Sequence, residues 1–342
     1  MRETNVVILA AGQGKRMRAV CSKVLCTVAG KPMLLWVTDA ARKAGADHVC
    51  VVASEPDVIR AVQDAGFEVR IQSERLGTGH ATRMAADFLE EHRDGDTLVL
   101  CGDAPFMDSE TIKKAYQQHK DEGNALTVVT AELPDGGNYG RILRDGSRLA
   151  AIVENADCTP EQAKIREINS GAFWFKTDVL IDTLGRIRNN NAQGEYYLTD
   201  AVALIIEAGE KAGACLADSQ DVVLGANDPA GLLLLNERAK AKAIEKHLAG
   251  GVQFELTDGV VIGPDVEIEA GACIRPGCSI TGRTVIGRGA VIGPNSIVRD
   301  SKVGEGAVVE CSVLDHADVP AGEKVGPFAV CTDRKDQKFK LI

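Results

Sequence analysis

The segment Val6–Met17 joins a run of apolar residues, Val6–Ala11, to a glycine-rich basic loop. Glycines let the backbone approach a ligand closely, and clustered backbone N–H groups favour anions. The loop lacks the spacing of a P-loop, and Met17 stands where the dinucleotide-binding fingerprint has its third glycine. The pattern favours phosphate binding by a loop of another class, the alternative being a tight turn with solvated lysines.

Positive charge is concentrated around this loop. No acidic residue lies between Glu3 and Asp39, although the chain as a whole has a net charge of −10. The basic residues of the segment are Lys15, Arg16, Arg18, Lys23 and Lys31. A basic pocket in an acidic protein suits a small, highly charged anion, whereas a nucleic acid polymer usually requires a basic face. We therefore expect no nucleic acid partner.

Asp103 follows a second apolar run, Thr97–Cys101. If that run is a strand of a parallel sheet, Asp103 lies at its carboxyl end, where ligands of such sheets bind. A carboxylate there is a suitable Mg²⁺ ligand. Gly-Asp-Ala-Pro is also a common turn composition, so the aspartate alone does not establish a metal site.

Short β-branched runs alternate with helical patterns over the first two thirds of the chain. The predicted strands are Val6–Ala10, His48–Ala53, Glu68–Gln72, Thr97–Cys101, Ala125–Thr130 and Gly171–Phe175. The predicted helices are Pro32–Ala44, Pro56–Ala65, Gly79–His92 and Ser109–Glu122. This alternation indicates an α/β fold with a Rossmann-like, mostly parallel sheet and helices on both faces.

A helix is predicted from Asp228 to Gly251, with Asp228 as cap, Pro229 in the first turn and Gly250-Gly251 at its end. After it, β-branched residues recur at six-residue spacing: Ile262, Ile268, Ile274, Ile280, Ile286, Ile292 and Val298. The period slips near Asp300 and resumes at Val303 and Val309. Such a repeat predicts a left-handed parallel β-helix with room for three to four coils of about 18 residues.

Length and composition fit a two-domain globular protein. The chain has 342 residues, of which 45% are hydrophobic and 26% charged. We place the α/β domain at 1–228, a linker helix at 229–250, the β-helix at 251–330 and a tail at 331–342. The ten cysteines show no C-x-x-C spacing, which favours reduced thiols. Without a signal-peptide pattern or an apolar run of ~20 residues, we expect a cytoplasmic protein with no membrane partner.

The first 250 residues resemble the sugar-nucleotide pyrophosphorylases. The opening Leu-Ala-Ala-Gly-x-Gly-x-Arg-Met is followed by Lys23-Val24-Leu25 and Gly30-Lys31-Pro32. Further motifs are Leu76–Ala81, Gly102–Pro105, Tyr139–Ile142, Glu167–Gly171 and Asn189–Asp200. The best match within that superfamily is the bacterial family that combines N-acetylglucosamine-1-phosphate uridyltransferase with glucosamine-1-phosphate acetyltransferase.

The resemblance implies an Mg²⁺-dependent enzyme whose substrates are UTP and a sugar 1-phosphate. The implied uracil-binding residues are Leu9, Ala10, Ala11, Gly12, Gln72, Gly77 and Thr78. Arg16 and Lys23 would contact the triphosphate and act, with Asp103, as catalytic residues. Asp103 and Asn227 would hold the metal. The implied sugar-binding residues are Gly140, Glu154, Asn169 and Thr199.

Three departures from the family pattern lie in this first part. Ser22 replaces a proline, which should loosen the loop that holds Lys23; Lys15 replaces a threonine; and Cys101 replaces a tyrosine near the metal-bound phosphate. The family's acetyl-transfer residues lie in later β-helix coils, so we expect no acetyltransferase activity from these 342 residues. The resemblance leads us to expect a homotrimer formed through the β-helix.

Other functions remain open on the sequence alone. The same chemistry would serve another pair of substrates, for example glucose 1-phosphate or dTTP. A non-catalytic sugar-nucleotide sensor is a second alternative, which the presence of Arg16, Lys23, Asp103 and Asn227 disfavours. An acyltransferase built on the β-helix alone is a third, disfavoured because His316 has no catalytic motif around it.

Overall fold

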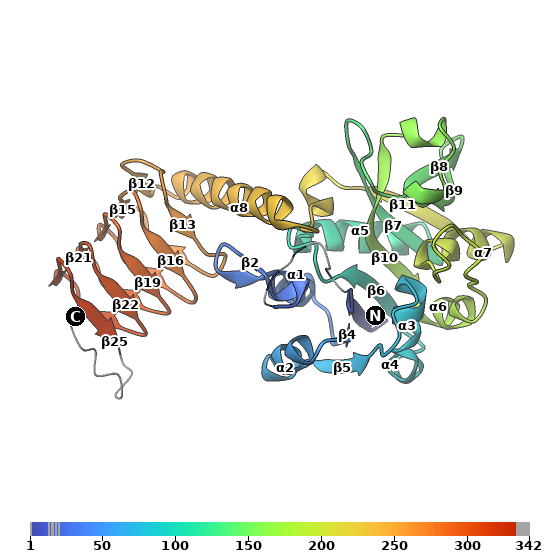
Figure 1. Cartoon of the computed structure of the whole chain (residues 1–342), viewed down its shortest axis with the longest axis horizontal. Coiled ribbons are helices and arrows are strands. Elements are labelled where there is room, and N and C mark those ends of the chain that lie inside the picture. Colours follow the sequence, from blue (N-terminus) through green and yellow to red (C-terminus); the bar gives the residue numbers. More distant parts are fainter. Residues whose placement is uncertain (1, 13, 15–16, 18, 20, 333–342) are drawn as a thin grey trace. The chain divides into compact units, whose positions relative to one another are not determined.

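The computed structural model describes residues 2–12, 14, 17, 19 and 21–332. The chain divides into two compact units (Figure 1). The first comprises Met1–Cys26 and Pro32–Gly231, and the second comprises Thr27–Lys31 and Leu232–Ile342. The short segment Thr27–Lys31 thus belongs with the C-terminal unit, which the boundaries drawn from the sequence did not anticipate.

A nine-stranded sheet forms the centre of the first unit. Its main path runs β11-β7-β10-β6-β1-β4-β5, and a β8–β9 hairpin extends from β10. The strands are β1 (Thr4–Ala10), β4 (His48–Ala53), β5 (Glu68–Ile71), β6 (Asp96–Cys101), β7 (Leu126–Glu132), β8 (Arg141–Asp145), β9 (Arg148–Val153), β10 (Glu167–Lys176) and β11 (Ala212–Leu216). Strand β1 pairs in parallel with β4 and β6, whereas β10 is antiparallel to β6 and β7. The prediction of a mostly parallel sheet is confirmed.

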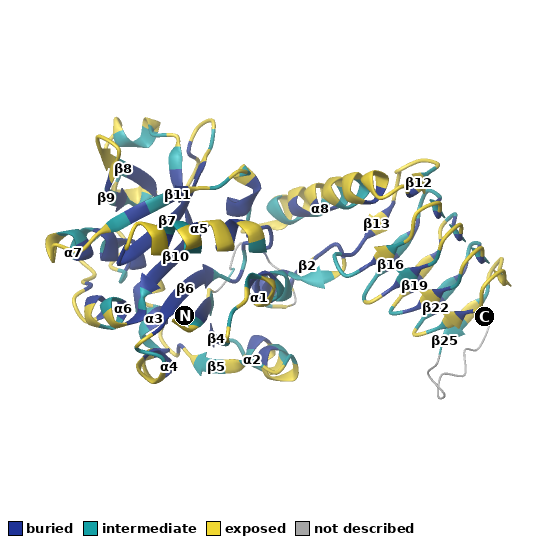
Figure 2. Ribbon diagram, turned by 180° about the vertical axis from the view of Figure 1, so that it is seen from behind, coloured by how far each residue is buried: buried dark blue, intermediate teal, exposed yellow. Residues whose placement is uncertain are grey.

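Helices pack against both faces of this sheet, as Figure 2 shows by the buried strands at its centre. They are α1 (Met33–Ala44), α2 (Pro56–Asp64), α3 (Thr78–Arg83), α4 (Ala86–Glu91), α5 (Ser109–Asp121), α6 (Thr177–Leu184) and α7 (Ala201–Glu207). Because side chains alternate along a strand, Val6 and Ile8 join the core with α1, α2 and α5. Val7 joins the opposite core with α3, α4, α6 and α7.

Several elements differ from the sequence prediction, which did not include β8, β9, α6 or α7. The helix expected at Gly79–His92 is two short helices, α3 and α4, separated by a turn at Met84-Ala85. Strand β11 was missed because its sequence, Ala-Gly-Ala-Cys-Leu, has little of the β-branched character that marks strands.

Helix α8 (Pro229–Ala249) begins and ends where its caps predict. The Asp228 carboxylate accepts a hydrogen bond from the Gly231 backbone N–H at 2.8 Å, and Gly251 has a positive φ of 83°. These are the expected signals of the first turn and of termination.

The second unit is a parallel β-helix, as predicted. Its strands are β12 (Gln253–Phe254), β13 (Val261–Ile262), β14 (Glu267–Ile268), β15 (Cys273–Ile274), β16 (Ser279–Thr281), β17 (Val285–Ile286), β18 (Val291–Ile292), β19 (Ile297–Arg299), β20 (Lys302–Val303), β21 (Val308–Val309), β22 (Val313–Asp315), β23 (Asp318–Val319), β24 (Lys324–Val325) and β25 (Val330–Thr332). They form three parallel sheets. Ile262 pairs with Ile280, but Val303 pairs with Val319, so the coils shorten after Asp300.

The segment Thr27–Lys31 carries strand β2 (Thr27–Val28) and the start of β3 (Lys31–Pro32), and it contacts the β-helix unit. The Ala29 backbone N–H donates to the Asn236 side chain at 2.9 Å, and the Lys31 ammonium lies 2.7 Å from the Asp265 carboxylate. Lys31 therefore does not join the anion pocket that the basic segment suggested, because an acidic partner in the second unit holds it.

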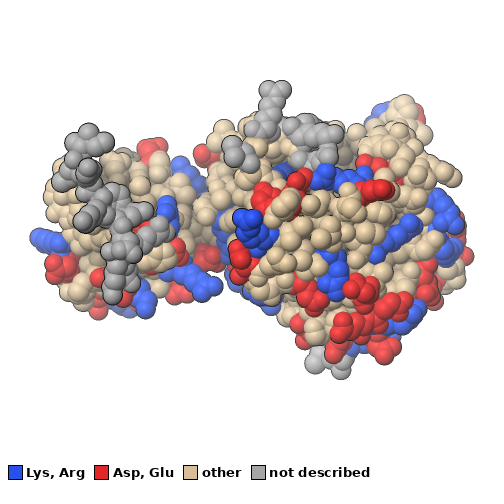
Figure 3. All heavy atoms as spheres, turned by 60° about the horizontal axis from the view of Figure 1, so that its bottom comes forward, with Lys and Arg blue, Asp and Glu red and all other residues tan. Residues whose placement is uncertain are grey.

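All ten cysteines are free, as expected of reduced thiols. Across the part of the chain that the structure describes, no helix combines the length and apolarity needed to cross a membrane. On the face drawn in Figure 3, lysine and arginine side chains are interspersed with acidic ones.

Candidate active site

Two adjoining cavities open at the carboxyl edge of the central sheet, the edge where β1 and β6 end. Their volumes are about 490 and 240 Å³. Leu9, Thr78, Cys101 and Asp103 line both. The parallel pairing of Leu9 with Cys101, and a Gly102 N–H bond to the Leu9 carbonyl at 2.9 Å, bring the ends of β1 and β6 side by side. The sheet register thus places Asp103 between the cavities.

The larger cavity is built on the loops after β1 and β5. Its further lining residues include Ala11, Gly12, Lys23, Gln72, Arg75, Gly77 and Glu195. Gln72 is buried, and its amide nitrogen lies 3.3 Å from the Gly77 carbonyl oxygen and 3.0 Å from His80 Nδ1. This arrangement holds one amide side chain and several backbone groups facing a common space, which suits a flat heterocycle with donor and acceptor edges.

Gly77 has a structural reason to be glycine. Its φ is +105°, and a Cβ there would lie 2.6 Å from the Tyr196 carbonyl oxygen. The Gly79 N–H donates to that carbonyl at 2.8 Å, and Leu198 N–H donates to Thr78 Oγ1 at 3.0 Å. The loop before α3 is therefore hydrogen-bonded to residues 196–198, of which Leu198 lines the smaller cavity.

A lysine bridges two oxygen-bearing side chains where the cavities meet. The Lys23 ammonium forms an ion pair with Asp103 Oδ2 and donates to Asn227 Oδ1 at 3.0 Å. The exposed fractions of the Lys23 and Asp103 side chains are 12% and 27%. Because both oxygens contact one ammonium, they already converge on a single positive charge.

The loop that carries Lys23 is anchored by the residue expected to loosen it. Ser22 donates its backbone N–H to Asp57 Oδ2 at 2.9 Å and its hydroxyl to Asp57 Oδ1 at 2.6 Å. Burial raises the pKa of Asp57, but the hydrogen bonds from Ser22, together with those from the Val58 and Asp57 backbone, make the net shift downward. Two hydrogen bonds to the start of α2 therefore anchor Ser22, and a looser loop than one with proline stays a prediction.

The smaller cavity is lined by polar groups from the residue after β9, from β10 and from the turn at Leu198-Thr199. Glu154 Oε1 accepts a hydrogen bond from the Thr199 hydroxyl at 2.9 Å. Asn169 precedes a register shift in β10, and its Oδ1 accepts from Gly171 N–H at 2.8 Å while its backbone N–H donates to the Gly140 carbonyl at 2.9 Å. Such a set of donors and acceptors can bind several hydroxyl groups at once.

Acidic and basic groups both surround this cavity. Burial raises the pKa of Glu154; the Thr199 hydrogen bond opposes that shift, and the carboxylates of Asp200, Asp157 and Glu195 reinforce it. Asp103 and Asn227 also line this cavity, and the Lys23 ammonium contacts both side chains. A ligand with a neutral polar part and an anionic part fits this polarity.

Cys101 stands at the junction of the two cavities. Burial, reinforced by Asp103 and opposed by Lys23, raises the pKa of its thiol to about 12. A Cβ on Gly171, whose φ is +80°, would lie 2.8 Å from the Cys101 sulfur. The thiol is thus neutral and closely packed against that glycine.

Most of the site residues predicted from the sequence line these cavities. The larger cavity brings together Leu9, Ala11, Gly12, Lys23, Gln72, Gly77, Thr78 and Asp103. The smaller one brings together Asp103, Gly140, Glu154, Asn169, Thr199 and Asn227. Ala10 is absent from both linings because the alternation of β1 turns its side chain into the core. Arg16 lies outside the described residues.

Sequence reasoning missed Arg75. Its Nε donates to the Ala11 carbonyl oxygen at 2.8 Å, and its guanidinium forms an ion pair with Glu55. Arg75 therefore supports the loop after β1 from across the cavity. Its position immediately before Leu76-Gly77-Thr78 was the only signal in the sequence.

These cavities, at the carboxyl edge of an α/β sheet, belong to a nucleotidyltransferase. Residues 6–167 match the MobA-like NTP transferase domain family, which covers the strands and loops of the larger cavity. The chain belongs to the GlmU family of bifunctional proteins. It is 39% identical over 341 residues to the bifunctional protein GlmU of Streptomyces avermitilis, covering 96% of this chain and 70% of that protein. It is 40% identical over 328 residues to the protein of the same name from Clostridium novyi, covering 95% and 72%.

Proposed function

We propose that the chain transfers the uridylyl group of UTP to N-acetylglucosamine 1-phosphate, forming UDP-N-acetylglucosamine and pyrophosphate. One observation carries the proposal: two adjoining cavities, of about 490 and 240 Å³, share Asp103, whose carboxylate pairs with Lys23 beside Asn227. Family membership supports it. In this assignment the larger cavity binds the nucleotide, and Glu154, Asn169 and Thr199 bind the sugar hydroxyls.

The reaction we propose is a single displacement. An oxygen of the sugar phosphate attacks the α-phosphorus of UTP, a new P–O bond forms, and the bond to the bridging oxygen breaks as pyrophosphate leaves with that electron pair. The attacking group is an anion at neutral pH, so no protein nucleophile is required. Lys23 and Arg16 stabilise the negative charge on the leaving phosphates.

Asp103 and Asn227 fit a magnesium ion. Mg²⁺ takes hard oxygen ligands, and the carboxylate and amide oxygens already converge on one cation, the Lys23 ammonium. When bound, Mg²⁺ would neutralise phosphate charge and align the substrates. Lys23 would then turn from Asp103 towards the triphosphate.

The test is pyrophosphate release by the purified protein with Mg²⁺. UTP, dTTP, CTP and GTP are crossed with N-acetylglucosamine 1-phosphate and glucose 1-phosphate. Turnover restricted to UTP and N-acetylglucosamine 1-phosphate is expected. Turnover with another pair would keep the mechanism and change the substrate. No turnover with any pair, despite nucleotide binding, would favour the sensor function instead.

Arg16→Ala tests the role of the loop arginine. Loss of a preorganised charge that contacts the transferring phosphates costs about 10²–10³-fold in rate. Full activity of Arg16→Ala would contradict the assignment.

Two further expectations remain predictions. The absence of acetyltransferase activity in these 342 residues is tested by supplying acetyl-CoA and glucosamine 1-phosphate to the same protein. The homotrimer is tested by analytical ultracentrifugation. Exposed apolar side chains in the β-helix unit, among them Ile297, Phe328 and Val330, support association with further copies.

A further inference from the structure

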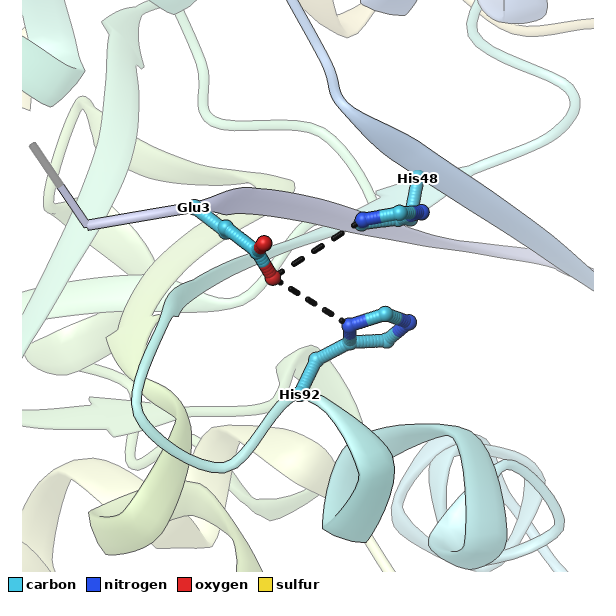
Figure 4. A group of neighbouring side chains, drawn as sticks. All are labelled: Glu3, His48 and His92. Carbon is cyan, nitrogen blue, oxygen red and sulfur yellow. Dashed lines mark ion pairs between the residues drawn. The ribbon is translucent and has the colours of Figure 1, made fainter.

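Three metal-ligating side chains gather at the amino edge of the central sheet, the edge opposite the two cavities. Glu3 immediately precedes β1, His48 begins β4, and His92 follows α4. Their ligand atoms all lie within 4.8 Å of one another. Figure 4 shows that a ring nitrogen of each histidine faces the Glu3 carboxylate.

The spacing suits an ion better than direct hydrogen bonds. Glu3 Oε2 lies 3.4 Å from His92 Nδ1 and 3.8 Å from His48 Nε2. An N–H···O hydrogen bond spans about 2.7–3.2 Å. Two ligands of a tetrahedral zinc ion, each about 2.0–2.1 Å from the metal, lie roughly 3.3 Å apart. The three groups are therefore close to the separations of a shared first coordination sphere.

The backbone beneath these side chains is well anchored. The Glu3 carbonyl accepts from Asp96 N–H at 2.8 Å, and the His92 carbonyl accepts from Gly95 N–H at 3.0 Å. Asn5 pairs with His48 in the β1–β4 ladder. Three segments that are far apart in the chain are thus held in fixed register around one point.

The two imidazoles differ in exposure and packing. Their rings stack with centroids 4.0 Å apart and planes 20° apart. Phe88 packs edge-on against His92 at 4.9 Å, and the His92 side chain is only 10% exposed, whereas His48 is 39% exposed. The nitrogen lone pairs lie in the ring planes, so those of two stacked rings do not converge on one point. His48, the more exposed ring, must therefore turn to share an ion with His92.

We propose that Glu3, His48 and His92 bind one divalent transition-metal ion of the zinc class. Two imidazole nitrogens and one carboxylate oxygen suit Zn²⁺, Co²⁺, Ni²⁺ or Cu²⁺, whereas Mg²⁺ and Ca²⁺ favour oxygen ligands alone. The exposed Glu3 leaves room for water as a fourth ligand.

The proposed metal site stabilises the folded chain and takes no part in nucleotidyl transfer. It joins the start of β1, the start of β4 and the turn before β6, at the edge that lies away from Lys23 and Asp103. Because the unfolded chain does not hold these three groups together, binding stabilises the folded protein.

The test is Zn²⁺ titration of the metal-stripped full chain, followed by equilibrium dialysis and thermal unfolding. We expect one ion per chain and a rise in Tm. Loss of a group that only supports a metal ligand weakens metal affinity about 10–100-fold. His92 is proposed as a direct ligand, so His92→Ala should weaken Zn²⁺ affinity by more than that. Glu3→Gln should weaken binding with no risk to folding, since the Glu3 side chain is 61% exposed.

Controls separate this site from other zinc-binding groups. His316 lies 3.8–4.0 Å from two carboxylates in the β-helix unit, so His316→Ala removes a comparable histidine and should leave binding unchanged. Co²⁺ binding is followed by absorption, because a thiolate-to-cobalt band would reveal cysteine ligands. Equal Zn²⁺ affinity in wild type, His92→Ala and Glu3→Gln, or a Co²⁺ thiolate band, would overturn the proposal.

Discussion

The two edges of the central sheet present different ligands for positive charge. At the carboxyl edge, the oxygens of Asp103 and Asn227 converge on the Lys23 ammonium. At the amino edge, two imidazoles face the carboxylate of Glu3. Oxygen ligands suit Mg²⁺ and nitrogen ligands suit zinc-class ions, so one sheet can hold two cations without competition between them.

Enclosure is the second difference. The carboxyl edge carries two adjoining cavities, and Asp103 lies on the walls of both. At the amino edge Glu3 also lines a cavity, of about 420 Å³, but its side chain is 61% exposed. Electrostatic contacts are stronger where water is excluded. Chemistry is therefore expected at the carboxyl edge, and the amino edge should affect stability alone.

Replacement of Asp103 should have the largest effect. Asp103→Asn keeps the shape of the side chain but removes the negative charge that holds the cation between the cavities. We expect a fall in kcat/KM of about 10²–10³-fold, measured by pyrophosphate release. Asp218→Asn is the matched control, since that carboxylate is 83% exposed and pairs only with Lys114 among the ion pairs that the structure shows. Equal activity of both variants would remove Asp103 from the site.

Lys23→Met should strengthen metal binding although it lowers turnover. The ammonium occupies the position between Asp103 and Asn227, so its removal frees both oxygens for a metal. A charged hydrogen bond is worth about 1.5–3 kcal/mol, so we expect Mn²⁺ to bind at least tenfold more tightly without nucleotide. Electron paramagnetic resonance of free Mn²⁺ measures this. Unchanged Mn²⁺ affinity would show that Lys23 does not occupy the cation position.

Glu154→Gln tests the carboxylate in the proposed sugar cavity. Burial raises the pKa of Glu154, so in wild type this carboxylate is neutralised at a higher pH than an ordinary glutamate as the pH falls. KM for the sugar phosphate should rise on that acid side, because the charged acceptor of sugar hydroxyls is lost. Glu154→Gln should raise KM about tenfold at neutral pH and abolish this acid rise.

The substrate phosphate also titrates, with a second pKa near ~6. That titration affects wild type and Glu154→Gln alike, so the difference between their KM profiles isolates Glu154. Parallel profiles would place the acid rise in the substrate and not in Glu154.

Local patterns made much of the fold predictable. The six-residue period from Ile262 to Val298 identifies the β-helix because each repeat forms one side of a coil. Asp103 was predictable from the strand before it, since strand ends define the ligand edge. Glu154, Asn169 and Thr199 required the family resemblance, because each alone is an ordinary polar residue.

Other features depend on tertiary contacts that no local pattern contains. Ser22 gains its anchor from Asp57, which is 35 residues away. Lys31 belongs to the basic segment in the sequence, but its ammonium pairs with Asp265, 234 residues later. Glu3, His48 and His92 come together only through the parallel register of the sheet and the turn after α4, so their spacing in the sequence carries no metal motif.

His92→Ala should have the smallest effect on turnover, and it is the sharpest test of the division between the two edges. The side chain lies at the amino edge, away from the cavity walls, so kcat and KM with Mg²⁺ should stay within about twofold of wild type, a difference of under about 0.5 kcal/mol. The Tm rise caused by Zn²⁺ should be lost in the same variant. A large fall in kcat with an unchanged circular dichroism spectrum would show that the edges are coupled, and would contradict a purely stabilising role for the amino-edge site.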